Sequence, residues 1–272
     1  MISFKKKLLG EKFLDELIKS HELGQKRDLV SDCQRFLKIN KIKFAATFKQ
    51  VKISGIPTII VSNHYKRPLF LSKSLFTTID SMITSTIITV SLSHLTKRKT
   101  TWVIKDNLIK NILFYEFKPR LAQISAIDVY DFIGVSQNYP FWGKSWWLAR
   151  LKSGYNIALY PEGAMTTKLR DPKLGLAQIL EYLAQNHIEV QILPIGVYFE
   201  DSTFKANFGK PFKYKSLDRV ELEVMCRIAQ NLPENLQGKW ATKASVRARS
   251  QVLQQPADGQ IPKLGELSEI AV

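Results

Sequence analysis

The sequence is short of cysteine and of long hydrophobic runs. Its 272 residues include only two cysteines, Cys33 and Cys226, and no C-x-x-C pair. We therefore expect two buried thiols, with neither a structural zinc site nor a disulfide framework. No run of about 18 apolar residues occurs, so we expect no membrane-spanning helix. The N-terminal residues 1–20 carry cations without an uninterrupted apolar stretch, and we expect no signal peptide.

Acidic residues are also scarce. The chain has 24 Asp and Glu against 40 Lys and Arg, which gives a formal net charge of +16. An excess of this size favours an anionic partner, namely nucleic acid, an anionic membrane surface, or an acidic carrier or cofactor. The charge alone does not choose among these partners.

Apolar residues recur at helical spacing over residues 8–40 and predict two amphipathic helices joined near Gly24. Beyond them, short apolar runs predict buried strands at 58–62, 101–105, 156–160 and 190–199. Helical patterns fall between and after these strands, at about 70–92, 144–153, 172–187 and 216–232. This alternation predicts an α/β fold with a largely parallel or mixed central sheet flanked by helices.

Three parts of the chain are expected to differ in organisation. Residues 1–50 form an N-terminal amphipathic helical segment, and residues 51–240 form the α/β domain. Residues 241–272 lack a clear apolar face, so we expect a partly disordered tail.

Two of the predicted strands end in residues that carry chemistry. The first strand runs into Asn63-His64, and the third runs into a Pro161-Glu162-Gly163 turn. Ligands of open α/β sheets collect where strands end and loops begin. We therefore expect the imidazole and the carboxylate to share one cleft.

The same segments resemble the glycerolipid (lysophospholipid) acyltransferase family. The family's Asn-His block, followed after four residues by Asp, resembles "NHYKRPL" at 63–69. Its Phe-Pro-Glu-Gly-Thr-Arg block resembles "YPEGAM" at 160–165, and its proline-containing strand resembles "ILPIGV" around Pro194. The resemblance covers about residues 50–240 and implies the fold of that family, with 1-acylglycerol-3-phosphate acyltransferase-like activity.

The resemblance implies transfer of a fatty acyl group from acyl-CoA or an acyl carrier protein to a lipid hydroxyl. The thioester is then a substrate, and no bound cofactor is expected. His64, beside Asn63, would act as the base, since an imidazole of pKa about 6.5 is mostly neutral at pH 7. Glu162, with Pro161 and Gly163, would bind the acceptor. The other interpretation is a strand-end histidine bonded to a carbonyl and a solvated turn glutamate.

The sequence departs from the family pattern at three places. Leu69 stands where the family has the Asp that orients the imidazole, and Asp80, Asp106 or Asp128 are candidates to replace that carboxylate. The second departure is at residues 131–137, which resemble the family's second block but contain no arginine. In the family, an arginine at the end of that block binds the acceptor phosphate.

Met165 occupies the other arginine place. The loss of both arginines leaves two interpretations: the acceptor carries no phosphate, or nearby cations bind its phosphate instead. The candidate cations, whose alternative role is that of solvated loop residues, are Lys66, Arg67, Lys168 and Arg170.

Tryptophans and cations alternate over residues 139–154, a pattern that suits a membrane interface. We therefore expect a cytoplasmic protein that associates peripherally with an anionic membrane, and no nucleic-acid partner. Two alternatives remain open from the residues: a catalytically weak or inactive lipid-binding protein on the same scaffold, and a basic nucleic-acid-binding protein.

Overall fold

The computed structural model describes residues 4–48, 51, 53, 55–67, 75–105, 121, 125–135, 144–173 and 175–241. The described helices are α1 (Phe4–Glu22), α2 (Leu29–Ile39), α3 (Leu75–Ser93), α5 (Lys144–Lys152), α6 (Leu176–Gln185) and α7 (Val220–Ala229), followed by 3-10 turns at Glu234–Leu236 and Gly238–Trp240. The described strands are β1 (Phe44–Phe48), β2 (Thr58–Ser62), β3 (Lys99–Lys105), β4 (Ile133–Val135), β5 (Tyr155–Leu159), β6 (Gln191–Glu200) and β7 (Thr203–Phe208).

These strands form one mixed sheet in the order β1-β7-β6-β2-β5-β3-β4. Strand β2 lies at its centre and pairs in parallel with β5 on one side and β6 on the other. Only the β6–β7 pair is antiparallel among the described pairings. The predicted α/β fold with a mixed, largely parallel sheet is therefore confirmed.

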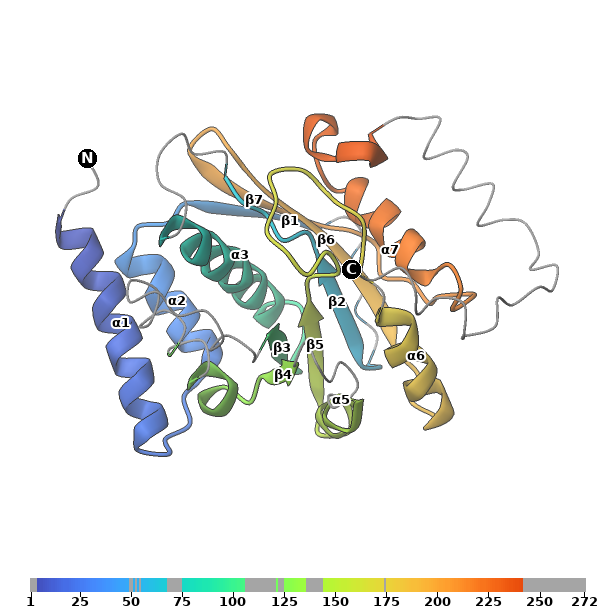
Figure 1. Cartoon of the computed structure of the whole chain (residues 1–272), viewed down its shortest axis with the longest axis horizontal. Helices are drawn as coiled ribbons and strands as arrows, with labels where there is room; N and C mark the ends of the chain where they lie inside the picture. Colours follow the sequence, from blue (N-terminus) through green and yellow to red (C-terminus); the bar gives the residue numbers. More distant parts are fainter. Residues whose placement is uncertain are drawn as a thin grey trace, which may run out of the picture.

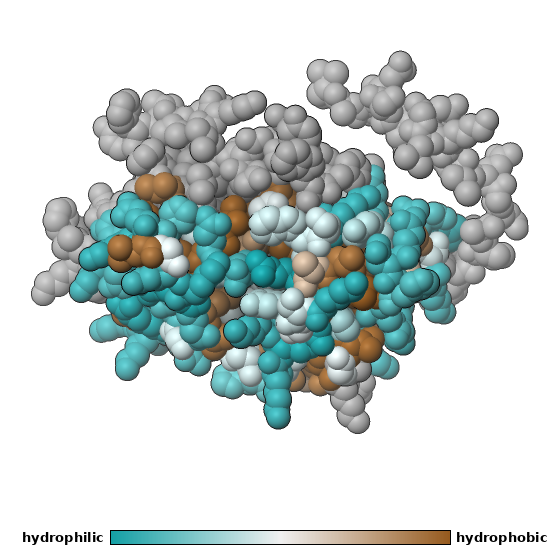
Figure 2. All heavy atoms as spheres, turned by 90° about the horizontal axis from the view of Figure 1, so that it is seen from below, coloured by the Kyte–Doolittle hydropathy of each residue, from teal (hydrophilic) through white to brown (hydrophobic). Residues whose placement is uncertain are grey.

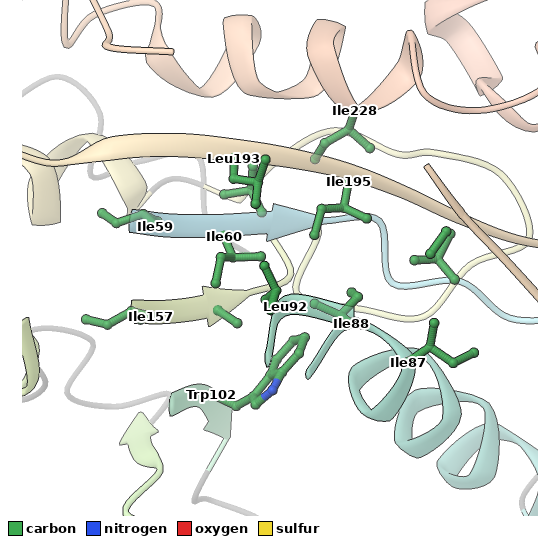
Figure 3. Close-up of a cluster of buried hydrophobic side chains, with 14 of the residues drawn as sticks. Ile59, Ile60, Ile87, Ile88, Leu92, Trp102, Ile157, Leu193, Ile195 and Ile228 are labelled. Carbon is green, nitrogen blue, oxygen red and sulfur yellow. The ribbon is translucent and has the colours of Figure 1, made fainter. Parts of the chain in front are cut away.

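Helices cover both faces of this sheet (Figure 1). Helices α1, α2 and α3 lie toward one face, while α6 and α7 lie toward the other. Figure 3 shows Ile87, Ile88 and Leu92 of α3 approaching the sheet from one side and Ile228 of α7 approaching from the other. The central strands are thus buried on both faces, which is why their sequences read as continuous apolar runs rather than alternating ones.

The N-terminal segment is part of the same structure. Phe13 and Leu17 of α1 and Phe36 of α2 belong to the buried hydrophobic cluster that also contains residues of the central strands. Helix α2 begins at an Asp28 cap, whose side chain accepts a hydrogen bond from the Ser31 amide. Strand β1, which lies inside the segment 1–50 that was predicted as helical, pairs in parallel with β7.

The four predicted strands and the six predicted helices are present with shifts of a few residues at their ends. Strands β1, β4 and β7 were missed. Strand β1 is half exposed, β4 has three residues, and β7 alternates between buried and half-buried positions, so none of them is a continuous apolar run. Of the predicted tail 241–272, only Ala241 is described.

Candidate active site

The ends of β2 and β5 lie side by side because the two strands are parallel neighbours. After β2, the chain continues next to the loop that follows β5: Thr166 N donates to the His64 carbonyl at 2.9 Å, and Lys66 N donates to the Thr166 carbonyl at 2.9 Å. Tyr65 and Thr166 thereby form a parallel bridge beyond the sheet. This short ladder holds His64 against the Pro161-Glu162-Gly163 turn.

The His64 ring is held by two side chains from different elements. It stacks on Tyr160, with 4.1 Å between ring centroids and 5° between the planes. The Tyr160 hydroxyl lies 3.0 Å from Thr84 Oγ1 on α3. Nε2 of His64 lies 3.0 Å from Ser81 Oγ, one turn earlier on the same helix. Nδ1 is buried and has no hydrogen-bond partner among the described residues.

Burial keeps this imidazole neutral. Loss of solvent around the ring lowers the pKa of His64 from 6.5 to about 4. Because no described carboxylate contacts the ring, nothing in the described structure offsets this effect by stabilising the imidazolium. At neutral pH the ring is therefore a proton acceptor rather than a cation.

Glu162 lies beside His64 but binds its backbone rather than its ring. One carboxylate oxygen accepts from the His64 amide at 2.8 Å. The other accepts from the Thr166 hydroxyl at 3.0 Å and from the Arg170 amide at 2.8 Å. The side chain is 3% exposed, and burial raises its pKa above the usual range. The carboxylate therefore joins three segments of chain around the site.

Asn63 is buried and directed into the sheet. Its amide nitrogen donates to the Val197 carbonyl at 2.8 Å, and its oxygen accepts from the Val197 amide at 2.7 Å. Both polar atoms are thus occupied by one residue of β6. This arrangement fixes the backbone at the end of β2, immediately before His64.

The two candidate orienting carboxylates that the structure describes, Asp80 and Asp128, bind other partners than the ring. Asp80 accepts from the Arg67 backbone amide at 3.0 Å and from its guanidinium at 2.8 Å. The same guanidinium lies over the rings of Phe199 and Phe204, at 5.3 and 5.2 Å from their centroids. Asp128 has a carboxylate oxygen 3.2 Å from Nδ1 of His21. Leu69 and Asp106 lie outside the described residues.

The remaining predicted acceptor-binding residues surround the same turn. Lys66 is half-buried, whereas Lys168 and Arg170 are exposed. Gly163 has a φ of +61°, a backbone conformation that L side chains rarely adopt, so the turn favours glycine. Pro161 accepts from the Lys173 amide at 2.9 Å.

A cavity of about 300 Å³ opens beside the His64 ring. Most of its lining is apolar, including Phe13, Leu17, Phe36 and Trp102. Helices α1, α2 and α3 supply most of these side chains, and Met165, which occupies an arginine place of the family block, also lines it. Glu162 is not among the described lining residues. A cavity with this lining suits an apolar group that contacts the imidazole.

Two polar features of the cavity lining were missed in the sequence. One is Ser81, and the other is Asp32, which is bound by the Arg27 guanidinium at 2.6 and 2.7 Å and by the Tyr130 hydroxyl at 2.7 Å. Asp32 and Arg27 are five residues apart, so their pairing was a local signal that could have been found. Tyr130 and Ser81 reach the cavity only through the tertiary arrangement.

Membrane association remains a prediction from the sequence. Within the part of the chain that the structure describes, every helix falls short of a bilayer-spanning segment in length or in hydrophobicity. On α5, Trp146 is 53% exposed while Trp147 is buried. The face in Figure 2 is largely hydrophilic, with apolar residues in separate patches. Among the described residues, no three His, Cys, Asp or Glu side chains are grouped to bind a metal ion.

The lowered pKa of His64 predicts acid sensitivity of the fold. Between pH 6.5 and 4 the unfolded chain binds a proton at His64 that the folded chain excludes, so the free energy of unfolding falls as the pH falls. From pH 7.5 to 4.5 this contribution amounts to about 2.5 kcal/mol. Urea unfolding at the two pH values should show a smaller loss in His64→Gln than in the wild type. Equal losses in both proteins would contradict the assignment.

Comparisons with known proteins leave the family open. No protein-family model matches the chain, and no curated protein matches it in sequence. Among solved structures, the chain is similar to the crystal structure of the 1-acyl-sn-glycerophosphate (LPA) acyltransferase PlsC from Thermotoga maritima. The identity is 12% and the TM-score 0.38, and the match covers 94% of this chain and 85% of that one. Similarity at this level does not define an activity, a substrate or a site residue for the chain.

Proposed function

We propose that the protein is an acyltransferase. It moves a fatty acyl group from an acyl-CoA or acyl-carrier-protein thioester to the hydroxyl of a (lyso)glycerolipid at a membrane surface. The observation that carries the proposal is a neutral imidazole, His64, that lines a mainly apolar cavity of about 300 Å³. The cavity accepts the acyl chain, and the imidazole accepts a proton from the attacking hydroxyl.

The residues around His64 favour its role as the base. Tyr160 fixes the plane of the ring by stacking, and Glu162 fixes its backbone through the His64 amide. Both contacts limit motion of the imidazole, and a well-positioned base requires such restriction. In this proposal Glu162 acts on the acceptor indirectly, by positioning the residue that receives its proton. The exposed cations Lys168 and Arg170 on the neighbouring loop bind the anionic part of a substrate.

A lipid-binding protein without turnover is the second candidate. It is favoured by the absence of any carboxylate bonded to the ring among the described residues and by the low pKa of His64. An imidazole is a weak base when nothing stabilises its protonated form. In that case the same cavity holds a fatty acyl chain without chemistry.

An acyl-transfer assay separates the two candidates. The full chain is mixed with palmitoyl-CoA or palmitoyl-acyl carrier protein and with liposomes carrying lysophosphatidic acid, monoacylglycerol or no acceptor. Free thiol and acylated lipid are measured. We expect multiple turnovers only with a donor and a hydroxyl acceptor together. Liposome binding without thiol release from any of these donor–acceptor pairs would overturn the proposal in favour of a lipid-binding protein.

A further inference from the structure

Ser81 occupies the position that an attacking hydroxyl would need. Its Oγ atom lies 3.0 Å from His64 Nε2, and both side chains line the same cavity. The two residues come from different elements, the end of β2 and helix α3. A hydroxyl within hydrogen-bond reach of an imidazole, with both groups lining one cavity, is the arrangement of an activated nucleophile.

The other ring nitrogen offers no alternative route. Nδ1 is buried and has no hydrogen-bond partner among the described residues. An acceptor hydroxyl that used His64 directly would therefore have to displace Ser81 from Nε2. Ser81 itself needs no displacement, because in the tautomer that carries the ring proton on Nδ1 its hydroxyl donates to Nε2.

The contact is fixed by its surroundings. Tyr160 stacks on the imidazole and also bonds to Thr84, three residues after Ser81 on α3. Tyr160 thus fixes the position of the His64 ring relative to helix α3. Ser85, which lines the same cavity, differs from Ser81 because its hydroxyl donates to the carbonyls of Ser81 and Met82 at 3.0 and 3.1 Å.

We propose that Ser81 is the nucleophile of a Ser–His pair and carries the acyl group as an ester between donor and acceptor. The inference deepens the proposed function and depends on it. Ser81 Oγ attacks the thioester carbonyl carbon while its proton passes to His64 Nε2. The carbon–sulfur bond then breaks, and the thiol leaves with that proton. An acceptor hydroxyl next attacks the ester carbonyl, gives its proton to His64, and Ser81 regains a proton as its oxygen leaves.

The chemistry of the donor agrees with a pair that lacks a carboxylate. A thiol has a pKa of about 8.5, so a thiolate leaves far more readily than an amine or an alkoxide. Acylation by a thioester therefore makes a smaller demand on the imidazolium than cleavage of an amide does. The acylation step suits this site. Transfer to the acceptor is expected to limit the rate, because the serine oxygen is a poorer leaving group than a thiolate.

Thiol exchange without an acceptor tests the inference. The full chain is incubated with palmitoyl-CoA and isotope-labelled CoA, and the label entering palmitoyl-CoA is measured. A covalent intermediate supports this exchange, whereas direct transfer to an acceptor does not. We expect exchange in the wild type and at least a 100-fold loss in Ser81→Ala. Acid-quenched wild type should also carry a palmitoyl ester on the peptide that contains Ser81.

Ser91→Ala is the matched control. Ser91 is buried on the same helix, it does not line the cavity among the described residues, and its hydroxyl has no described partner, so its removal should leave exchange unchanged. If Ser81→Ala transfers acyl groups at the wild-type rate while His64→Gln does not, the assignment of Ser81 as the nucleophile is overturned and the proposed function stands. A wild type that transfers no acyl group under any condition would overturn both.

Discussion

Replacing His64 with glutamine is expected to lower acyl transfer by about 10²–10⁴-fold, the usual contribution of a positioned general base. Glutamine fills a similar space, and its amide can stack on Tyr160 and bond to Ser81, yet it cannot accept a proton at neutral pH. The loss should appear in kcat and in kcat/KM alike, because the proton is transferred in the transition state. Rates of thiol release with saturating acceptor provide the measurement.

The pH profile of the wild type gives an independent check on the same residue. Since burial lowers the pKa of His64 to about 4, the acid limb of kcat/KM should lie near pH 4 rather than near 6.5. His94→Gln is the matched control, because His94 is exposed just beyond the end of α3. A His64→Gln protein that keeps more than a tenth of the wild-type turnover would remove the imidazole from the mechanism.

The part of the site that could be predicted from sequence follows from the strands. Residues 58–62 and 156–160 are continuous apolar runs, and such runs in an α/β pattern become neighbouring parallel strands whose ends meet at one edge. The approach of His64 to Glu162 follows from that pairing. The sequence pattern did not indicate which atoms meet, and the Glu162 carboxylate contacts the backbone amide of His64.

Ser81, which was missed, reaches the site because of the way α3 crosses the sheet. A helical pattern over 70–92 predicts the helix, but the turn of the helix that faces the end of β2 depends on its packing angle and register. Ser81 and Asp80 are adjacent in sequence and point to different partners, Ser81 to the His64 ring and Asp80 to Arg67. A carboxylate was predicted as the partner of His64 because the family pattern has an Asp in that role.

Glutamine at position 162 is expected to lower the free energy of unfolding by about 2–4 kcal/mol, because hydrogen bonds to a buried charged group contribute more than neutral ones. The Glu162 carboxylate accepts three hydrogen bonds, and the amide nitrogen of glutamine would turn a donor toward at least one of these donors. Urea unfolding measures the change. Glu181→Gln, at an exposed position of α6, is the matched control and should leave the free energy unchanged within about 0.5 kcal/mol.

The kinetics of the same variant distinguish a positioning role from acceptor binding. If Glu162 holds the His64 backbone, the Glu162→Gln protein that remains folded at low temperature should have a lower kcat, whichever substrate is varied. The reason is that the imidazole shifts relative to the reacting atoms. If the carboxylate binds the acceptor, the variant should raise the KM for the acceptor alone and unfold like the wild type. The three donors already directed at this carboxylate favour the first outcome, since an acceptor hydroxyl would have to compete with all of them.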